Sequence, residues 1–184
     1  GAIGVIRVSG PEAISITSKI FTPIGGKTLD ERKPYTLTFG KILSAEGEII
    51  DEVLVSVFRA PHSYTGENST EISCHGSSYI LQQVMKRLIE CGCRTALPGE
   101  YTQRAFLNGK MDLSQAEAVA DLIASTSTAT HRMAMNQMRG GFSQELSILK
   151  DKLLHLTSLM ELELDLSDHE ELEFADRTEL SQIA

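Results

Sequence analysis

The chain has 184 residues and a mass of 20.2 kDa, enough for one ordinary domain or for one domain with a helical extension. Hydrophobic residues make up 41% and charged residues 23%, a composition that supports a packed core and excludes wholesale disorder. No apolar run approaches the ~20 residues that span a bilayer, and the chain does not begin with a signal pattern, which excludes a membrane protein. The three cysteines are poorly spaced for a disulfide framework and favour a reducing, cytosolic setting.

The net charge of −8 comes from one end of the chain. Residues 161–184 contain nine acidic residues and one base, Arg177, whereas residues 1–160 contain 16 acids and 16 bases. The acidic balance therefore does not exclude a polyanionic ligand for residues 1–160. The acidic end resembles a set of divalent-ion ligands in composition only, and a solvated helix face explains it better.

Strands are predicted before residue 98, where β-branched residues alternate with polar ones between turn signals. They are Ile3–Val8, 36–43, 49–58, Asn68–Cys74 and a last short strand, Cys93–Leu97. The first predicted helix begins near Pro11 and ends before Pro23. The second runs from about Ser78 to a stop at Gly92.

Helices are predicted from Glu100 onward, the first ending near Asn108-Gly109. Ser114 and Glu117 predict a capping box for the next helix. Gly140-Gly141 predicts a bend or close packing ahead of a long helix. That helix has a heptad seam and a second apolar stripe, which predict packing on more than one side, as in a bundle. The seam residues are Phe142, Leu146, Leu149, Leu153, Leu156 and Met160, and the second stripe is Ile148, Leu154, Leu159 and Leu162.

This order of elements predicts an α+β domain over residues 1–112, followed by part of an all-α domain over residues 113–184. The chain opens at Gly1 without an initiator Met and stops inside a helical pattern, so we expect a piece of a longer protein.

No self-contained catalytic signature is present, because the sequence lacks a P-loop, a nucleophile elbow, a zincin helix and a dinucleotide fingerprint. We therefore expect no catalytic residue and no GTP hydrolysis by this chain. Cys74-His75 and Cys91-Gly92-Cys93 offer soft metal ligands, but the Cys-x-Cys spacing is awkward for zinc. Buried thiols are the better interpretation, and we expect no metal site.

Three charged residues occupy unusual positions. Arg7 shares a strand face with Ile3 and Val5, so we expect it to be partly buried and to need an anionic partner. Glu71 points to the polar face of its strand, and Lys110 lies in a turn where a cation can meet a ligand. From spacing alone, a structural Arg7–Glu71 ion pair with a solvated Lys110 is the simpler interpretation.

Three segments closely resemble the MnmE (TrmE) family: Ile6-Arg7-Val8-Ser9-Gly10, the Ser63–Gly76 run SYTGENSTEISCHG, and the Pro98–Leu113 run PGEYTQRAFLNGKMDL. The match continues through Gln115-Ala116-Glu117-Ala118 to Ile123, and the resemblance covers essentially the whole chain.

The resemblance implies a tRNA-modifying GTPase that acts at C5 of the wobble uridine, with a flavoprotein partner, MnmG (GidA), and a one-carbon folate donor. It implies a mixed-sheet N-terminal domain that binds a tetrahydrofolate derivative (5-formyl or 5,10-methylene) and forms a homodimer, followed by a central helical domain. The GTPase domain of the family, with its GTP, Mg²⁺ and K⁺, is absent from this chain. We expect a cytoplasmic protein without membrane contact that reaches tRNA through the complex.

The folate contacts of the family map onto Arg7, Glu71 and Lys110, and this overturns the simpler interpretation of those residues. A carboxylate suits the pterin edge, so Glu71 is expected to read the pterin while Arg7 and Lys110 meet carboxylate or carbonyl oxygens. None of the three cysteines takes the role of the family's C-terminal cysteine, which this chain lacks.

Two other functions remain open. One is a structural dimerisation module with a vestigial folate pocket. The other is a direct tRNA-binding module, which requires a concentrated basic patch, whereas the bases of residues 1–160 are scattered.

Overall fold

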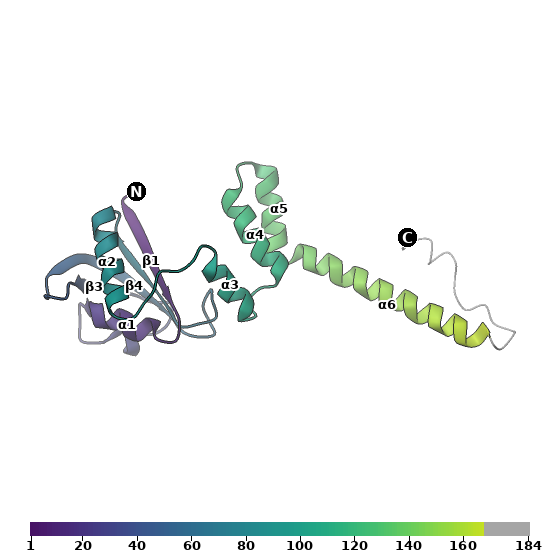
Figure 1. Cartoon of the computed structure of the whole chain (residues 1–184), viewed down its shortest axis with the longest axis horizontal. Helices are drawn as coiled ribbons and strands as arrows, with labels where there is room; N and C mark the ends of the chain where they lie inside the picture. Colours follow the sequence, from purple (N-terminus) through teal and green to yellow (C-terminus); the bar gives the residue numbers. More distant parts are fainter. Residues whose placement is uncertain (168–184) are drawn as a thin grey trace. The chain divides into compact units, whose positions relative to one another are not determined.

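The structure is a computed structural model that describes the backbone of residues 1–167 and the side chains of residues 1–162. The chain divides into two compact units, Gly1–Asp112 and Leu113–Ala184 (Figure 1). Among residues 1–167, no helix is both long and apolar enough to cross a membrane.

The first unit is built on a five-stranded sheet in the order β1-β5-β4-β3-β2. The strands are β1 (Ile3–Ser9), β2 (Phe21–Pro23), β3 (Leu37–Leu43), β4 (Ile49–Phe58) and β5 (Ser69–His75). Its helices are α1 (Ala13–Ile20), the 3₁₀ turn η1 (Leu29–Glu31), α2 (Ser78–Glu90) and α3 (Glu100–Leu107). The α+β class is confirmed, but all neighbouring strands run antiparallel, so the expected mixed sheet is wrong.

One face of the sheet forms the hydrophobic core with α1 and α2. Val53, Val55 and Val57 alternate along β4 and are at most 1% exposed, as the period-2 pattern predicts. The helices contribute residues at helical spacing, such as Ile16 on α1 and Leu88 on α2, to the same cluster.

The opposite face of the sheet carries side chains that the first unit leaves exposed. Strand register places Val5, Ser73, Leu54 and Phe39 in one row across β1, β5, β4 and β3. Val5 is 57% exposed, Phe39 44% and Leu54 39%. This apolar row, Val5–Ser73–Leu54–Phe39, lies beside the row that begins with Arg7 and Glu71.

The predicted strand over Cys93–Leu97 is wrong, because this segment joins no sheet. Its polar groups bond elsewhere: Cys93 N donates to Leu88 O at 3.0 Å, and Leu97 N donates to Glu100 Oε2 at 2.7 Å. The short strand β2 and the turn η1, which the sequence patterns do not predict, lie in the connection before β3.

The second unit contains α4 (Leu113–Ala124), α5 (Thr128–Met138) and α6 (Gly141–Ser167). α4 packs on α5, Ala118 and Ala134 of these helices are buried, and Gln137 Nε2 donates to Ser114 O at 3.0 Å. The predicted capping box at Ser114 is wrong, since α4 already begins at Leu113. The Ser114 hydroxyl has no hydrogen-bond partner among the described residues. Ser127 instead caps α5.

The long helix predicted after Gly140-Gly141 is confirmed as α6, and α5 ends just ahead of this pair, so the predicted bend is confirmed too. Among the residues that the structure describes, α6 does not pack on several sides. Most of its apolar residues are exposed, with Leu146 at 49%, because α5 is the main element that α6 contacts within the described part of this unit. The acidic segment 161–184 lies mostly outside the described residues.

Candidate functional site

Arg7 and Glu71 face each other across β1 and β5 on the open face of the sheet. Arg7 Nε and Nη2 both bond Glu71 Oε1, at 3.0 and 2.9 Å. Their side chains are 39% and 30% exposed, so the anionic partner expected for Arg7 is found in a half-exposed pair. Within the described chain, Glu71 Oε2 takes no hydrogen bond, which leaves one carboxylate oxygen free to accept.

Two tyrosine rings flank the Arg7 guanidinium. Its Cζ lies 5.4 Å from the ring centroid of Tyr64 and 5.5 Å from that of Tyr101, within cation–π range. Tyr101 OH donates to Arg7 O at 2.5 Å on the outer edge of β1, and Tyr64 OH bonds Thr102 Oγ1 at 2.9 Å. Burial raises the pKa of Tyr101, so its phenol stays a donor at neutral pH. These rings present flat apolar surface beside the ion pair.

Lys110 makes its hydrogen bond away from the Arg7–Glu71 pair. Its Nζ donates to Pro61 O at 3.1 Å, in the loop between β4 and β5 that also carries Tyr64. Gly66 (φ +78°) lets this loop lie close to Asn108 and Lys110, since a Cβ at Gly66 would lie 3.0 Å from Asn108 Cβ and 3.3 Å from Lys110 Cγ. No hydrogen bond or ion pair joins Lys110 to Arg7 or Glu71 among the described residues.

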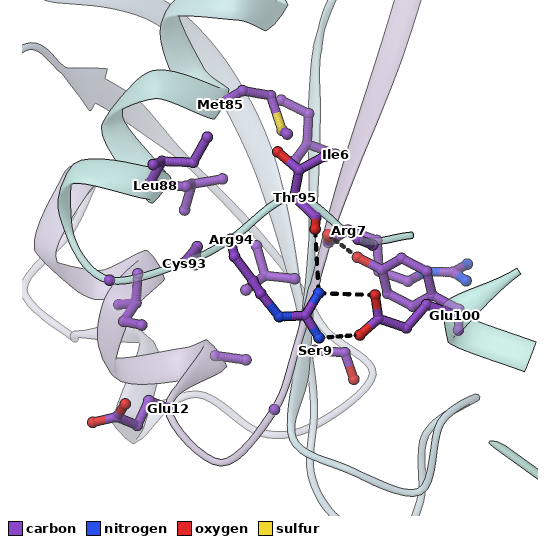
Figure 2. A pocket seen from close by; sticks show the side chains of 18 of the residues that line it. Ile6, Arg7, Ser9, Glu12, Met85, Leu88, Cys93, Arg94, Thr95 and Glu100 are labelled. Atoms are coloured by element: carbon purple, nitrogen blue, oxygen red, sulfur yellow. Dashed lines mark hydrogen bonds and ion pairs between the residues drawn. The ribbon is translucent and has the colours of Figure 1, made fainter. Parts of the chain in front are cut away.

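A second carboxylate, Glu100 at the start of α3, is buried and fully occupied. Arg94 and Arg104 both bond it, Arg94 across the pocket drawn in Figure 2, and Leu97 N donates to its Oε2 at 2.7 Å. The Arg94 hydrogen bond first, then the Leu97 N–H, lower the pKa of Glu100 to about 2. This network holds the chain that enters α3.

Arg104 links α3 to the β4–β5 loop and to the end of β1. Its Nη1 donates to Glu67 Oε1 at 2.8 Å, and Ser9 Oγ donates to Glu67 Oε2 at 2.7 Å. Asn108 Nδ2 donates to Thr65 O at 2.8 Å. Because α3 carries Tyr101, these bonds fix the position of that ring beside Arg7.

A cavity of about 450 Å³ opens between β1, α1, the end of α2 and α3. Ile6 and Leu88 line its apolar side, and Arg94 lies on its polar side, where it bonds Glu100 (Figure 2). Glu71 and Lys110 are not among its lining residues. The structure thus brings Arg7 and Glu71 together on the open face of the sheet. Arg7 is among the residues around the cavity, but its guanidinium pairs with Glu71, and Lys110 bonds the β4–β5 loop from the turn after α3.

Cys74 and Cys93 are neutral thiols at neutral pH, because burial raises the pKa of both. Cys74 is 3% exposed, and burial, with the charge of Asp51 as a smaller cause, raises its pKa to about 11. Burial also raises the pKa of Cys93.

Asp51 accepts from His75 N at 2.9 Å and pairs with its Nδ1 at 2.7 Å. Among the described residues, no group of three or more His, Cys, Asp or Glu side chains is arranged to hold a metal ion.

Several residues of this site were missed by sequence reasoning about single positions: Tyr64, Glu67, Glu100, Tyr101 and Arg104. The i,i+4 spacing of Glu100 and Arg104 at a helix start is a usable signal for their pairing. Contacts such as Arg104–Glu67 join residues far apart in the chain, and no local pattern predicts them.

Comparison with known families accounts for nearly the whole chain. The family model for the GTP-binding protein TrmE N-terminus matches residues 1–110, and the model for the MnmE helical domain matches residues 113–184.

Curated relatives agree with these matches. A tRNA modification GTPase MnmE from Bacteroides thetaiotaomicron is 75% identical over 185 residues, which cover 100% of this chain and 39% of the relative. The protein of the same name from Phocaeicola vulgatus is 67% identical over 216 residues, covering 100% of the chain and 43% of the relative. The one from Flavobacterium johnsoniae is 57% identical, covering 100% and 39%. The chain spans about two fifths of the length of these relatives, and it belongs to the MnmE (TrmE) family.

Proposed function

We propose that this chain is the folate-binding and dimerising part of a tRNA modification GTPase, together with the first helices of its helical domain. Residues 1–112 would bind a tetrahydrofolate derivative, and residues 113–184 would lead to the rest of the protein. The observation that carries the proposal is the half-exposed Arg7–Glu71 pair, with a free carboxylate oxygen, between two tyrosine rings.

The chemistry of these residues fits a folate. A pterin offers ring N–H and amine donors along one edge, which a carboxylate can accept. Glu71 Oε2 is available for this role because both Arg7 bonds go to Oε1. Tyr64 and Tyr101 supply aromatic surface for a flat heterocycle. Cations suit the negative tail of a folate, and Lys110 Nζ uses one of its three donors on Pro61 O.

In this proposal Glu71 accepts from the pterin edge, while Arg7 and Lys110 donate to carboxylate or carbonyl oxygens of the ligand. Arg7 also holds Glu71 ionised and in place, and the Glu100–Arg104 network holds Tyr101. A bound folate would supply the one-carbon unit for modification of the wobble uridine.

The open face of the sheet supports a homodimer. The apolar row Val5–Ser73–Leu54–Phe39 exposes three large apolar side chains next to the Arg7–Glu71 pair. A second copy covering this row would bury that surface and flank the candidate folate site. The GTPase activity, the flavoprotein partner, the tRNA substrate and a cytoplasmic location belong to the same proposal and follow from the resemblance.

The alternative is a structural dimerisation module without functional folate binding. Both functions predict a dimer through the same sheet face, so the oligomeric state does not separate them. Folate binding separates them directly.

The test is a calorimetric titration of the 184-residue chain with 5-formyltetrahydrofolate. Glu71→Gln should weaken binding about 10- to 100-fold, since hydrogen bonds to charged groups contribute about 1.5–3 kcal/mol. Lys110→Gln should weaken it by a smaller factor, because its cation meets the ligand from an exposed loop.

Matched controls are Glu52→Gln, which removes a carboxylate from the same open face, and Lys27→Gln, which removes an exposed lysine. Both should bind like the unmodified chain. Absence of binding by a folded, dimeric chain would contradict the folate proposal and favour the structural module. Equal effects of the Glu71 and Glu52 substitutions would contradict the role of Glu71.

A further inference from the structure

A second surface with binding chemistry lies wholly in the second unit. A groove of about 700 Å³ runs along α5 and the start of α6, which follow each other in the chain (Figure 1). We call it the α5–α6 groove. The polar residues lining it are Thr128, His131, Arg132, Asn136, Arg139 and Gln144. All of them can donate hydrogen bonds, with His131 doing so in either tautomer, and none carries a carboxylate.

The groove concentrates positive charge in a chain whose other bases are scattered. Residues 122–144 contain Arg132 and Arg139 but no Asp or Glu. The seven-residue spacing of the two arginines places them on one side of α5, roughly 10 Å apart along its axis. Neither arginine forms an ion pair with a carboxylate among the described residues. Their charges are therefore available to a ligand.

The junction between the two helices is tightly built. A Cβ on Gly141 would lie 2.5 Å from Asn136 Oδ1 and 2.6 Å from Nδ2, so the glycine leaves room for the Asn136 amide in the groove. Gly141 and Gln144 belong to the first turn of α6, a helix of 27 residues. The positive end of that helix dipole adds to the potential of Arg132 and Arg139.

We propose that the α5–α6 groove binds the phosphodiester backbone of RNA. Two unpaired guanidiniums about two helical turns apart, amide donors beside them and no carboxylate suit a row of phosphates. An acidic peptide would meet the same cations, and competition with poly-L-glutamate distinguishes it from RNA. The choice of RNA rests on the proposed function. The groove itself rests on the geometry of α5 and α6.

The test measures binding of a short fluorescein-labelled RNA hairpin to the 184-residue chain by fluorescence anisotropy over a range of salt concentrations. The variant Arg132→Gln/Arg139→Gln removes both cations from the groove. Its matched control, Lys150→Gln/Lys152→Gln, removes two exposed cations from α6 outside the groove. The two variants have the same net charge, so they separate a local site from the overall field.

The groove variant should bind RNA at least about tenfold more weakly, and its slope of log K against log salt should be smaller by about 2. The control variant should lose much less of both. Arg132→Lys/Arg139→Lys should restore most of the salt slope, and circular dichroism should show that all variants are folded, because the substituted side chains are exposed.

Three results would overturn the proposal: equal losses in groove and control variants, displacement of RNA by inorganic phosphate at the same concentration of phosphate groups, or equal displacement by poly-L-glutamate. Folate titration of the groove variant keeps the two proposals apart. If the unmodified chain binds RNA but does not bind folate, the proposed folate function alone is rejected. If the unmodified chain binds folate but does not bind RNA, the proposal for the α5–α6 groove alone is rejected.

Discussion

Two arginine–glutamate clusters in the first unit use the same chemistry to different ends. Glu100 is 7% exposed and accepts hydrogen bonds from two arginines and a backbone N–H. Glu71 is half exposed and accepts from Arg7 on one oxygen only. A carboxylate whose acceptor sites are all occupied holds the fold together. A carboxylate with an oxygen left over, beside aromatic rings, can still take a ligand.

The difference has a physical origin in where each residue lies. Glu100 stands where the chain turns into α3, and its partners Arg94 and Arg104 come from both sides of it in sequence. Glu71 lies in the middle of a strand, where alternation directs its side chain to the open face of the sheet. The comparison predicts that stability depends on Glu100 and that ligand affinity depends on Glu71.

The largest expected loss of stability comes from Glu100→Gln. The amide cannot accept from Arg94, Arg104 and Leu97 N–H together, and it leaves the Arg94 guanidinium without its counter-charge while Arg104 keeps only Glu67. We expect the melting temperature to fall by more than about 5 °C. Thermal unfolding followed by circular dichroism measures this change. An unchanged melting temperature would contradict the structural role of Glu100.

The pH dependence of stability is a second test of the structural role of Glu100. The pKa of Glu100 is lowered from 4.5 to about 2 by the fold. A lowered pKa stabilises the folded state above pH 4.5, and this contribution is lost as the pH falls from 4.5 towards 2. Melting temperatures measured between pH 2 and 6 should therefore drop more steeply for the unmodified chain than for Glu100→Gln. Parallel profiles would show that Glu100 does not contribute to acid stability.

A much smaller effect is expected from Glu71→Gln. Its ion pair with Arg7 is half exposed, and such pairs contribute about 1 kcal/mol or less. Urea unfolding should give a free energy of unfolding within about 1 kcal/mol of the unmodified chain. A loss as large as that of Glu100→Gln would mean that Glu71 is chiefly a structural residue.

The smallest effect is expected from Tyr101→Phe, which keeps the ring beside Arg7 and removes only the hydroxyl bond to Arg7 O. An exposed hydrogen bond of this kind contributes about 1 kcal/mol or less to stability. Urea unfolding measures it, with Tyr79→Phe on α2, an exposed tyrosine, as the control. A loss above 2 kcal/mol, on the order of a buried unsatisfied group, would show that the β1 edge depends on this bond.

Much of the fold could be predicted from the sequence where local patterns are strong. β1, β3, β4, β5, α2 and α3 follow from alternation, helical spacing and glycine stops. Cys93–Leu97 has strand-like composition but no sheet neighbour, and composition carries no information about a neighbour. Ser114 matches a capping box by spacing, yet α4 starts one residue earlier, since helix boundaries are set by the packing of the helix as well as by its caps.

Some contacts of the candidate site could likewise be predicted from the sequence, and others could not. Alternation along the strands predicts that Glu71 points to a polar face, that Arg7 is partly buried beside Ile3 and Val5, and that Arg7 needs an anion. The structure pairs the two residues on the open face of the sheet. The tyrosine rings around Arg7 and the Glu67–Arg104 link depend on a loop and a helix meeting β1 in space. Sequence spacing cannot give that meeting, because the contacting residues lie tens of positions apart.

The most direct test of the account measures two quantities on two variants: folate affinity by calorimetry and free energy of unfolding by urea, for Glu71→Gln and Glu100→Gln. The account predicts opposite outcomes. Glu71→Gln should keep its stability and lose about 10- to 100-fold in affinity for 5-formyltetrahydrofolate. Glu100→Gln should lose stability and, while folded, lose less affinity than Glu71→Gln, because Glu100 reaches the ligand only through the position of Tyr101. Affinity that falls with Glu100→Gln and is untouched by Glu71→Gln would contradict the assignment of the site.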